Sequence, residues 1–150
     1  MIKPRWLLIA NEFAPFKGDN YPILLSKELN KRKTICLFIS NKVDFNFSIN
    51  DTYFFPERTD SEALTLGANI VVSFSNDLFS LNCIRKFNEM GVMTSFIVSN
   101  DETPLRNQAM LTEAKYGFTI NEELYKKYCR RILASPTPEM INLLEGELHG

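Results

Sequence analysis

The segment from Trp6 to Lys33 constrains the fold more than any other part of the chain. It begins with Trp6–Ala10, an apolar run of the length expected for a strand that is buried on both faces. Asn11–Gly18 then breaks the pattern, because Pro15 and Gly18 interrupt regular structure, and an amphipathic helix with a basic end follows. A loop that leads from a buried strand into a helix is where open α/β sheets bind anions, because backbone N–H groups and the helix dipole converge there.

Short apolar runs typical of buried strands recur along the rest of the chain. They cover residues 34–40, 53–55, 70–74, 92–98 and 118–120, and residues 131–134 fit either a last strand or the end of a helix. Helical patterns lie between them, at residues 60–66, 78–90, 105–115, from Asn121 onward, and from Thr137 to Gly146, where glycine is expected to end the helix. This alternation predicts one doubly wound α/β domain over residues 1–150, a mostly parallel Rossmann-like sheet with helices on both faces.

Charge, cysteine content and hydropathy narrow the class of protein. The formal net charge of −1 argues against a dedicated nucleic-acid-binding protein, which would carry a basic excess. Cys36, Cys83 and Cys129 are widely spaced and match no metal or disulfide pattern, so we expect free thiols in a reducing cytosol. No apolar run approaches the about 20 residues that a membrane-spanning helix needs. We therefore expect a cytoplasmic protein.

The inventory of reactive residues excludes several mechanisms. The single histidine, His149, is next to the last residue, which argues against Ser-His-Asp or Cys-His catalysis and against a zinc site. The chain contains neither GxGxxG nor GxxxxGK[ST], the glycine-rich motifs of dinucleotide-binding and P-loop proteins. We expect no metal and no cofactor, and these residues identify no catalytic group.

Three polar segments follow predicted strands and should meet at the carboxyl edge of the sheet, the edge where parallel strands end. The candidate binding residues there are Phe16, Lys17, Gly18, Asp19, Asn76, Asp77, Asn100, Asp101 and Glu102. Lys17 beside Gly18 could bind a phosphate, and the carboxylates could accept hydrogen bonds from hydroxyl groups or act as a base. A simpler interpretation is that Asp77 and Asp101 cap helices, a very common role for aspartate, and that Gly18 serves a tight turn.

Four basic residues near the end of the chain form a second feature. Lys126, Lys127, Arg130 and Arg131 lie within six positions of one another. They could contact an anionic membrane at its inner face. Alternatively, they form a solvated helix face.

Residues 9–40, IANEFAPFKGDNYPILLSKELNKRKTICLFIS, resemble the first β-loop-α-β unit of GT-B glycosyltransferases, especially the retaining family that builds bacterial surface polysaccharides. Phe13-Ala14-Pro15 corresponds to the F/Y-x-P element of that family, and Gly18 to the first glycine of its Gly-Gly turn. Further along, Gly67–Val72 resembles the "GADIV" segment that begins a middle strand. Ile132–Met140 resembles the family's "IIAxSxxxxxxL" strand and helix.

The resemblance implies an acceptor-binding N-terminal domain of a nucleotide-sugar-dependent glycosyltransferase that transfers hexosyl or deoxyhexosyl groups. Asp19 replaces the second glycine of the family's turn and puts a negative charge where a donor phosphate would approach, which favours the acceptor side. The family's donor-binding domain has no counterpart in these residues. The implied partners are a sugar or glycan acceptor and a donor-binding domain or partner chain, without which we expect no transfer.

Two other functions fit the predicted fold. One is a flavodoxin-like or receiver-like binding or regulatory domain without catalysis. A receiver domain needs an acidic pair after its first strand and an aspartate ending its third, whereas here Glu12 stands alone and Asp77 lies beyond Phe74. The other is a small enzyme that acts on a nucleotide at the same edge, for which we identify no base.

Overall fold

The computed structural model describes residues 2–13, 21–43, 52–56, 67–132 and 138–149, and only the backbone of residues 11–13, 37, 39–43 and 52–56. Its centre is a seven-stranded sheet in which every neighbouring pair is parallel. The strands are β1 (Arg5–Phe13), β2 (Ile35–Val43), β3 (Thr52–Pro56), β4 (Ile70–Ser73), β5 (Met93–Val98), β6 (Tyr116–Thr119) and β7 (Arg131–Ile132). The predicted α/β class and parallel sheet are thus confirmed.

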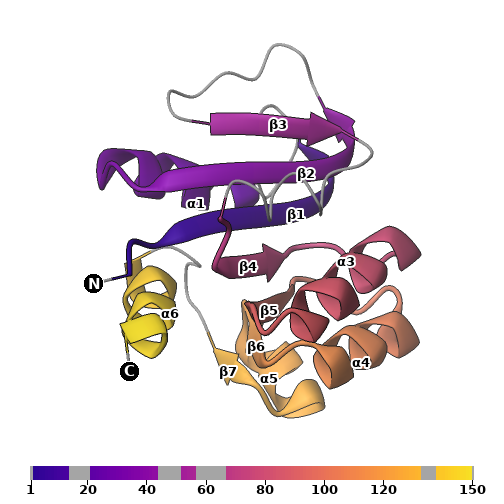
Figure 1. Ribbon diagram of the computed structural model, residues 1–150. Coiled ribbons are helices and arrows are strands. Elements are labelled where there is room, and N and C mark those ends of the chain that lie inside the picture. Colours follow the sequence, from indigo (N-terminus) through magenta and orange to yellow (C-terminus); the bar gives the residue numbers. More distant parts are fainter. Residues whose placement is uncertain (1, 14–20, 44–51, 57–66, 133–137, 150) are drawn as a thin grey trace.

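Helices cover both faces of the sheet (Figure 1). The described helices are α1 (Tyr21–Lys31), α3 (Leu78–Glu89), α4 (Pro104–Glu113), α5 (Glu122–Tyr128) and α6 (Pro138–His149). Helices α1 and α6 pack on one face and helices α3, α4 and α5 on the other, which confirms the doubly wound arrangement. No helix in the described part of the chain is long and apolar enough to cross a membrane.

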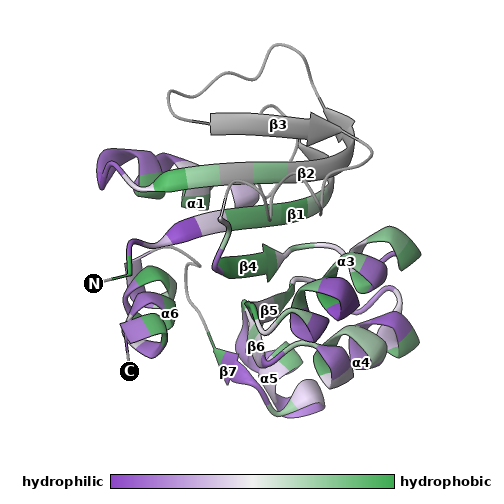
Figure 2. Cartoon of the chain, viewed as in Figure 1, coloured by the Kyte–Doolittle hydropathy of each residue, from purple (hydrophilic) through white to green (hydrophobic). Residues whose placement is uncertain are grey.

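Strand β1 contributes side chains to two separate hydrophobic cores. Trp6, Leu8 and Ala10 pack against α1 and α6, whereas Leu7 and Ile9 face the other helix layer. All five side chains are buried. This two-sided burial explains the continuous apolar run in the sequence, and the strands at the middle of the sheet are correspondingly apolar in Figure 2.

The strand order β3-β2-β1-β4-β5-β6-β7 contains the Rossmann order 3-2-1-4-5-6. The chain moves outward from β1 in one direction and then from β4 in the other, so the order reverses between these two adjacent strands. Flavodoxin-like and receiver-like sheets have the order 2-1-3-4-5 and lack a strand outside the second one. Here β3 occupies that place and pairs with β2, with Leu37 opposite Tyr53.

Several predicted boundaries were wrong. Strand β2 ends later than expected, at Val43 rather than Ser40. Strand β1 continues through Asn11–Phe13, where a break was expected, because parallel pairing with β2 still satisfies the backbone there. Helix α6 passes through Gly146 to His149 instead of ending at the glycine. Its buried residues, including Met140 and Leu144, pack into the core and outweigh the weak helix propensity of one exposed glycine.

The structure also tests the expectations for residues 131–134, for Gly91 and for the cysteines. Residues 131 and 132 form a strand, which decides between the two alternatives left open by the sequence. Gly91 follows the end of α3 with φ +74°, as expected for a glycine that terminates a helix. All three cysteines are free thiols, and burial raises the pKa of the Cys36 thiol. The helix predicted for residues 60–66 lies outside the described residues.

Gly146 and Gly91 give a matched pair of substitutions, because an added methyl group meets nothing within 4 Å at either position. Gly146→Ala should raise the free energy of unfolding by about 0.5–1 kcal/mol, since alanine has the higher helix propensity. Gly91→Ala should lower it by about 1–2 kcal/mol, since alanine is strained at positive φ. Urea unfolding measures both changes. Destabilisation by Gly146→Ala would show that α6 ends at the glycine after all.

Candidate functional site

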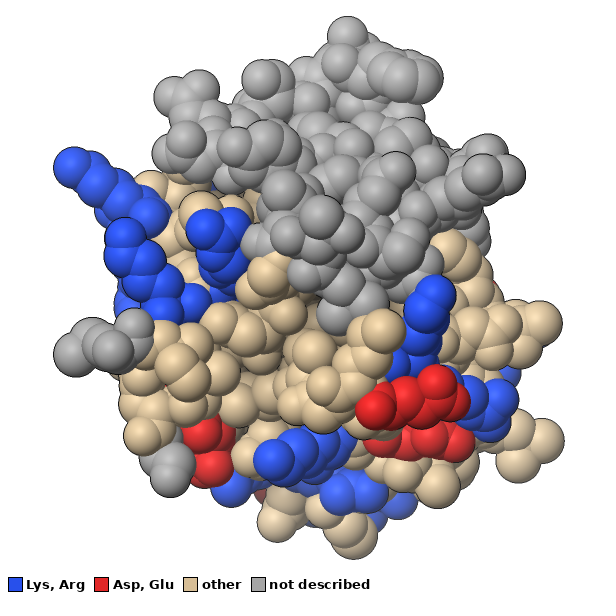
Figure 3. Space-filling view, in the orientation of Figure 1, with Lys and Arg blue, Asp and Glu red and all other residues tan. Residues whose placement is uncertain are grey.

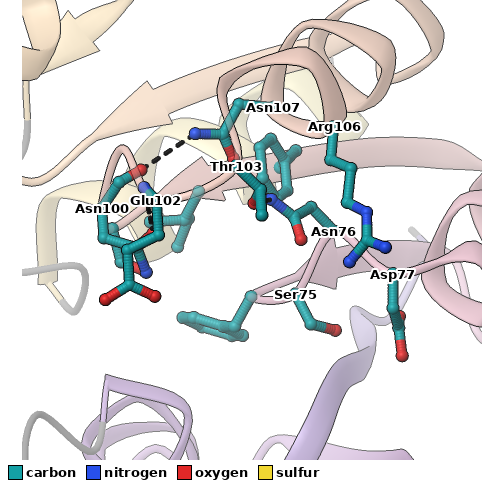
Figure 4. Close-up of a pocket in the computed structure, with 12 residues that line it drawn as sticks. Ser75, Asn76, Asp77, Asn100, Glu102, Thr103, Arg106 and Asn107 are labelled. Carbon is teal, nitrogen blue, oxygen red and sulfur yellow. Dashed lines mark hydrogen bonds between the residues drawn. The ribbon is translucent and has the colours of Figure 1, made fainter.

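A pocket of about 290 Å³ opens at the carboxyl edge of the sheet, between the exits of β4 and β5 (Figure 4). Its lining residues are Phe74, Ser75, Asn76, Asp77, Phe96, Ile97, Ser99, Asn100, Glu102, Thr103, Arg106 and Asn107. Because β4 is one of the two strands at which the order reverses, the pocket lies beside the switch point. Ligands of doubly wound sheets characteristically bind in that crevice.

The buried side chain of Asn107, in the first turn of α4, connects three segments around the pocket. Its Oδ1 accepts a hydrogen bond from Asn76 Nδ2 at 2.8 Å. Its Nδ2 donates to the carbonyl oxygen of Asn100 at 2.9 Å and to the hydroxyl of Tyr128 at 3.1 Å. One carboxamide therefore joins the exits of β4 and β5 to helix α5.

Asn76 presents its remaining polar atom to the pocket. Its Nδ2 donates both to Asn107 and to Thr103 Oγ1, the latter at 2.7 Å. In Figure 4 its carboxamide oxygen points into the space between Ser75 and Arg106. Because the amide group is held by two bonds from its nitrogen, this acceptor is positioned for a ligand before any ligand binds.

Asp77 both lines the pocket and caps helix α3. Its Oδ1 accepts from the backbone N–H of Ser80 at 3.0 Å and from the Ser80 hydroxyl at 2.5 Å. The Ser80 Oγ also lies 2.5 Å from Ser75 Oγ. The capping interpretation of Asp77 is confirmed.

Asp101 is not a helix cap, so that interpretation was wrong. Thr103 occupies the N-cap of α4, and the carboxylate of Asp101 instead accepts hydrogen bonds from Lys127 Nζ and from the Tyr128 hydroxyl. The bond from Lys127, followed by that from Tyr128, lowers the pKa of Asp101. The same Asp101–Lys127 bond raises the pKa of Lys127. Asp101 does not line the pocket but holds α5 against the exit of β5.

The structure thus brings together four of the predicted residues, Asn76, Asp77, Asn100 and Glu102, around one pocket. Phe16, Lys17, Gly18 and Asp19 lie outside the described residues. Sequence reasoning missed Thr103, Arg106 and Asn107. The sequence could have identified them, because the helix predicted from Leu105 should begin at the carboxyl edge of the sheet. Thr103 lies just before that helix, and Arg106 and Asn107 lie in its first turn.

The four basic residues near the chain end do not form one continuous stripe. Lys127 pairs with Asp101, and Lys126 Nζ lies 4.0 Å from a carboxylate oxygen of Glu122. Arg130 and Arg131 line a separate pocket at the opposite edge of the sheet. Contact with a membrane through these residues stays a prediction.

The chemistry that the carboxyl-edge pocket offers is hydrogen bonding by amides, hydroxyls and carboxylates, with one guanidinium, that of Arg106. No imidazole lines it, since His149 ends helix α6. Among the described residues, no three His, Cys, Asp or Glu side chains are grouped so that they could hold a metal ion. No protein-family model, curated protein or solved structure matches the chain.

Replacing Asn107 tests whether its carboxamide organises the pocket. Asn107→Leu keeps the branched shape of the side chain but removes one hydrogen-bonding partner each from Asn76, the Asn100 carbonyl and the Tyr128 hydroxyl. We expect the free energy of unfolding to fall by about 2–4 kcal/mol, since buried polar groups without partners are costly. The control is Gln108→Leu, an exposed residue of the same helix, for which about 0.5 kcal/mol or less is expected. Equal effects in urea unfolding would contradict the proposed role of Asn107.

Proposed function

We propose that this chain is the acceptor-binding domain of a nucleotide-sugar-dependent glycosyltransferase of the GT-B type, acting in polysaccharide or glycan biosynthesis. The observation that carries the proposal is the polar pocket at the carboxyl edge, next to the switch point of a sheet in Rossmann order. The resemblance of residues 9–40 to the first unit of such enzymes supports the same assignment.

The pocket suits a sugar ring better than a highly charged ligand. Asn76 Oδ1 accepts hydrogen bonds, and the carboxylate of Glu102 and the guanidinium of Arg106 add an exposed acceptor and exposed donors. Sugar hydroxyls both donate and accept, so they match such a mixed set. The volume of about 290 Å³ lies just below the usual range for small-molecule pockets, about 300–1,000 Å³, which favours a single sugar unit.

Exposed apolar side chains beside the pocket support a partner at this edge. Leu78 and Leu105, in the first turns of α3 and α4, are 70% and 85% exposed. Covering both side chains would remove apolar surface from water and so favour docking of a partner at this edge. A donor-binding domain or partner chain seated here would cover both leucines and close the acceptor pocket.

The structure gives less support to a receiver-like regulatory domain. Strand β3 lies where a receiver sheet has no strand. The carboxylate of Asp77, the candidate phosphorylation site, is already engaged as the cap of α3. Labelling of Asp77 by a small phosphodonor would nevertheless favour that alternative.

Binding of methyl glycosides, followed by saturation-transfer NMR, tests the proposed acceptor pocket. At least one glycoside in a panel of methyl hexosides and deoxyhexosides should bind, and the double variant Glu102→Ala/Arg106→Ala should weaken that binding at least about tenfold. The matched control is Arg85→Ala/Glu113→Ala, which removes an ion pair between the same two helices, α3 and α4, away from the pocket.

Two results would contradict the proposal in different ways. Equal losses of binding in both double variants would place the sugar outside this pocket. The chain alone could also transfer a sugar from a nucleotide-sugar to water or to a glycoside. Such transfer would contradict the proposal that the chain supplies only the acceptor-binding domain.

A further inference from the structure

A second pocket of about 290 Å³ lies at the opposite, amino edge of the sheet, where β6 and β7 begin. It is lined by Lys115, Tyr116, Gly117, Cys129, Arg130 and Arg131. Three of these six residues are cations, and none of the six is a carboxylate. The Lys and Arg side chains at the lower edge of Figure 3 lie over β7 and α5, in the same region.

Contacts with Gly117 and with the Leu111 carbonyl fix the side chain of Arg130. A Cβ atom at Gly117 would lie only 3.1 Å from Cδ and 3.2 Å from Cγ of Arg130, so the glycine lets the arginine stem lie directly on strand β6. One guanidinium nitrogen lies 3.5 Å from the carbonyl oxygen of Leu111, near the C-terminal end of α4. A guanidinium has five N–H donors, so most of them stay available to a ligand.

Among the described residues, no carboxylate neutralises these cations. The Lys115 Nζ lies 5.6 Å from the centre of the Tyr116 ring, a cation–π distance that does not neutralise its charge. No carboxylate of the described residues forms a salt bridge with Lys115, Arg130 or Arg131. The carboxylate of Glu147 accepts a hydrogen bond from the Tyr116 hydroxyl at 3.2 Å, and it lines a neighbouring pocket instead.

We propose that this amino-edge pocket binds the phosphate or diphosphate group of a small phosphorylated molecule. Two guanidinium groups and one ammonium group around a hollow supply the charge-assisted and bidentate hydrogen bonds that phosphate oxygens accept. The hollow shape favours an inserted phosphate over the flat surface of a membrane. Because the pocket is at the edge opposite the acceptor pocket, this site is independent of the proposed glycosyltransferase function.

Cys129 provides a reporter in the pocket wall. It is exposed, whereas Cys36 and Cys83 are only 2% and 6% exposed, so iodoacetamide should modify Cys129 alone in the folded protein. Inorganic pyrophosphate, added at constant ionic strength, should slow this alkylation several-fold, as followed by mass spectrometry. Because iodoacetamide is uncharged, slower alkylation reports occupation of the pocket rather than repulsion of the reagent.

Charge variants separate binding in the pocket from general attraction of anions. Arg131→Gln should raise the pyrophosphate concentration needed for half-protection about fivefold, in line with the loss of one exposed charge-assisted contact. The control Lys126→Gln removes the same charge from an exposed residue that precedes Cys129 on α5 and does not line the pocket, and it should leave half-protection unchanged. Calorimetric titration of Cys129→Ser with pyrophosphate gives a second readout that does not depend on the thiol.

Three outcomes would overturn the proposal. Pyrophosphate could fail both to protect Cys129 and to give heat with Cys129→Ser. Arg131→Gln and Lys126→Gln could weaken protection equally, which would indicate unspecific screening. Finally, vesicles of phosphatidylglycerol could bind the chain through these cations while pyrophosphate gives no protection, which would assign them to a membrane surface.

Discussion

Burial of the central strands on both faces is the constraint from which the rest of the structure follows. Strand β1 sends alternate side chains into two cores, and each core needs its own layer of helices. Described helices therefore cover both broad faces of the sheet, and the pockets among the described residues lie at its carboxyl and amino edges. The two polar pockets discussed above lie at these edges, one at the carboxyl ends of β4 and β5 and one at the amino ends of β6 and β7.

The carboxyl-edge pocket depends on a second, smaller constraint, the burial of the Asn107 carboxamide. A buried amide is tolerated only when its donors and acceptor are satisfied, and here the partners come from Asn76, Asn100 and Tyr128. Those partners belong to three different segments, so satisfying one side chain also fixes the loops relative to each other. The remaining acceptor of Asn76 is held in place as a consequence. A binding group is thereby positioned by the same hydrogen bonds that stabilise the fold.

Local patterns in the sequence identified the features that depend on local interactions. The apolar runs of β1, β4 and β5 were recognised because both faces of these strands are buried, and Asp77 was recognised as a cap because capping involves only neighbouring residues. Features that depend on distant contacts were not recognised. The partners of Asp101 are 26 and 27 positions away in the sequence, and two partners of Asn107 are 31 and 21 positions away. No rule based on local spacing relates residues so far apart in the sequence. Gly146 stays helical because α6 packs on the sheet, which local propensity does not reveal.

We propose that the carboxyl-edge pocket, formed by the exits of β4 and β5, binds a sugar. Backbone amide chemical shifts of the isotopically labelled chain, followed during titration with a methyl hexoside, test this claim most directly. Shifts should be confined to residues 74–77 and 99–107, with the amides of residues 115–117 unchanged. Shifts centred on any other part of the molecule, or none at sugar concentrations that saturate typical weak acceptor sites, would contradict it.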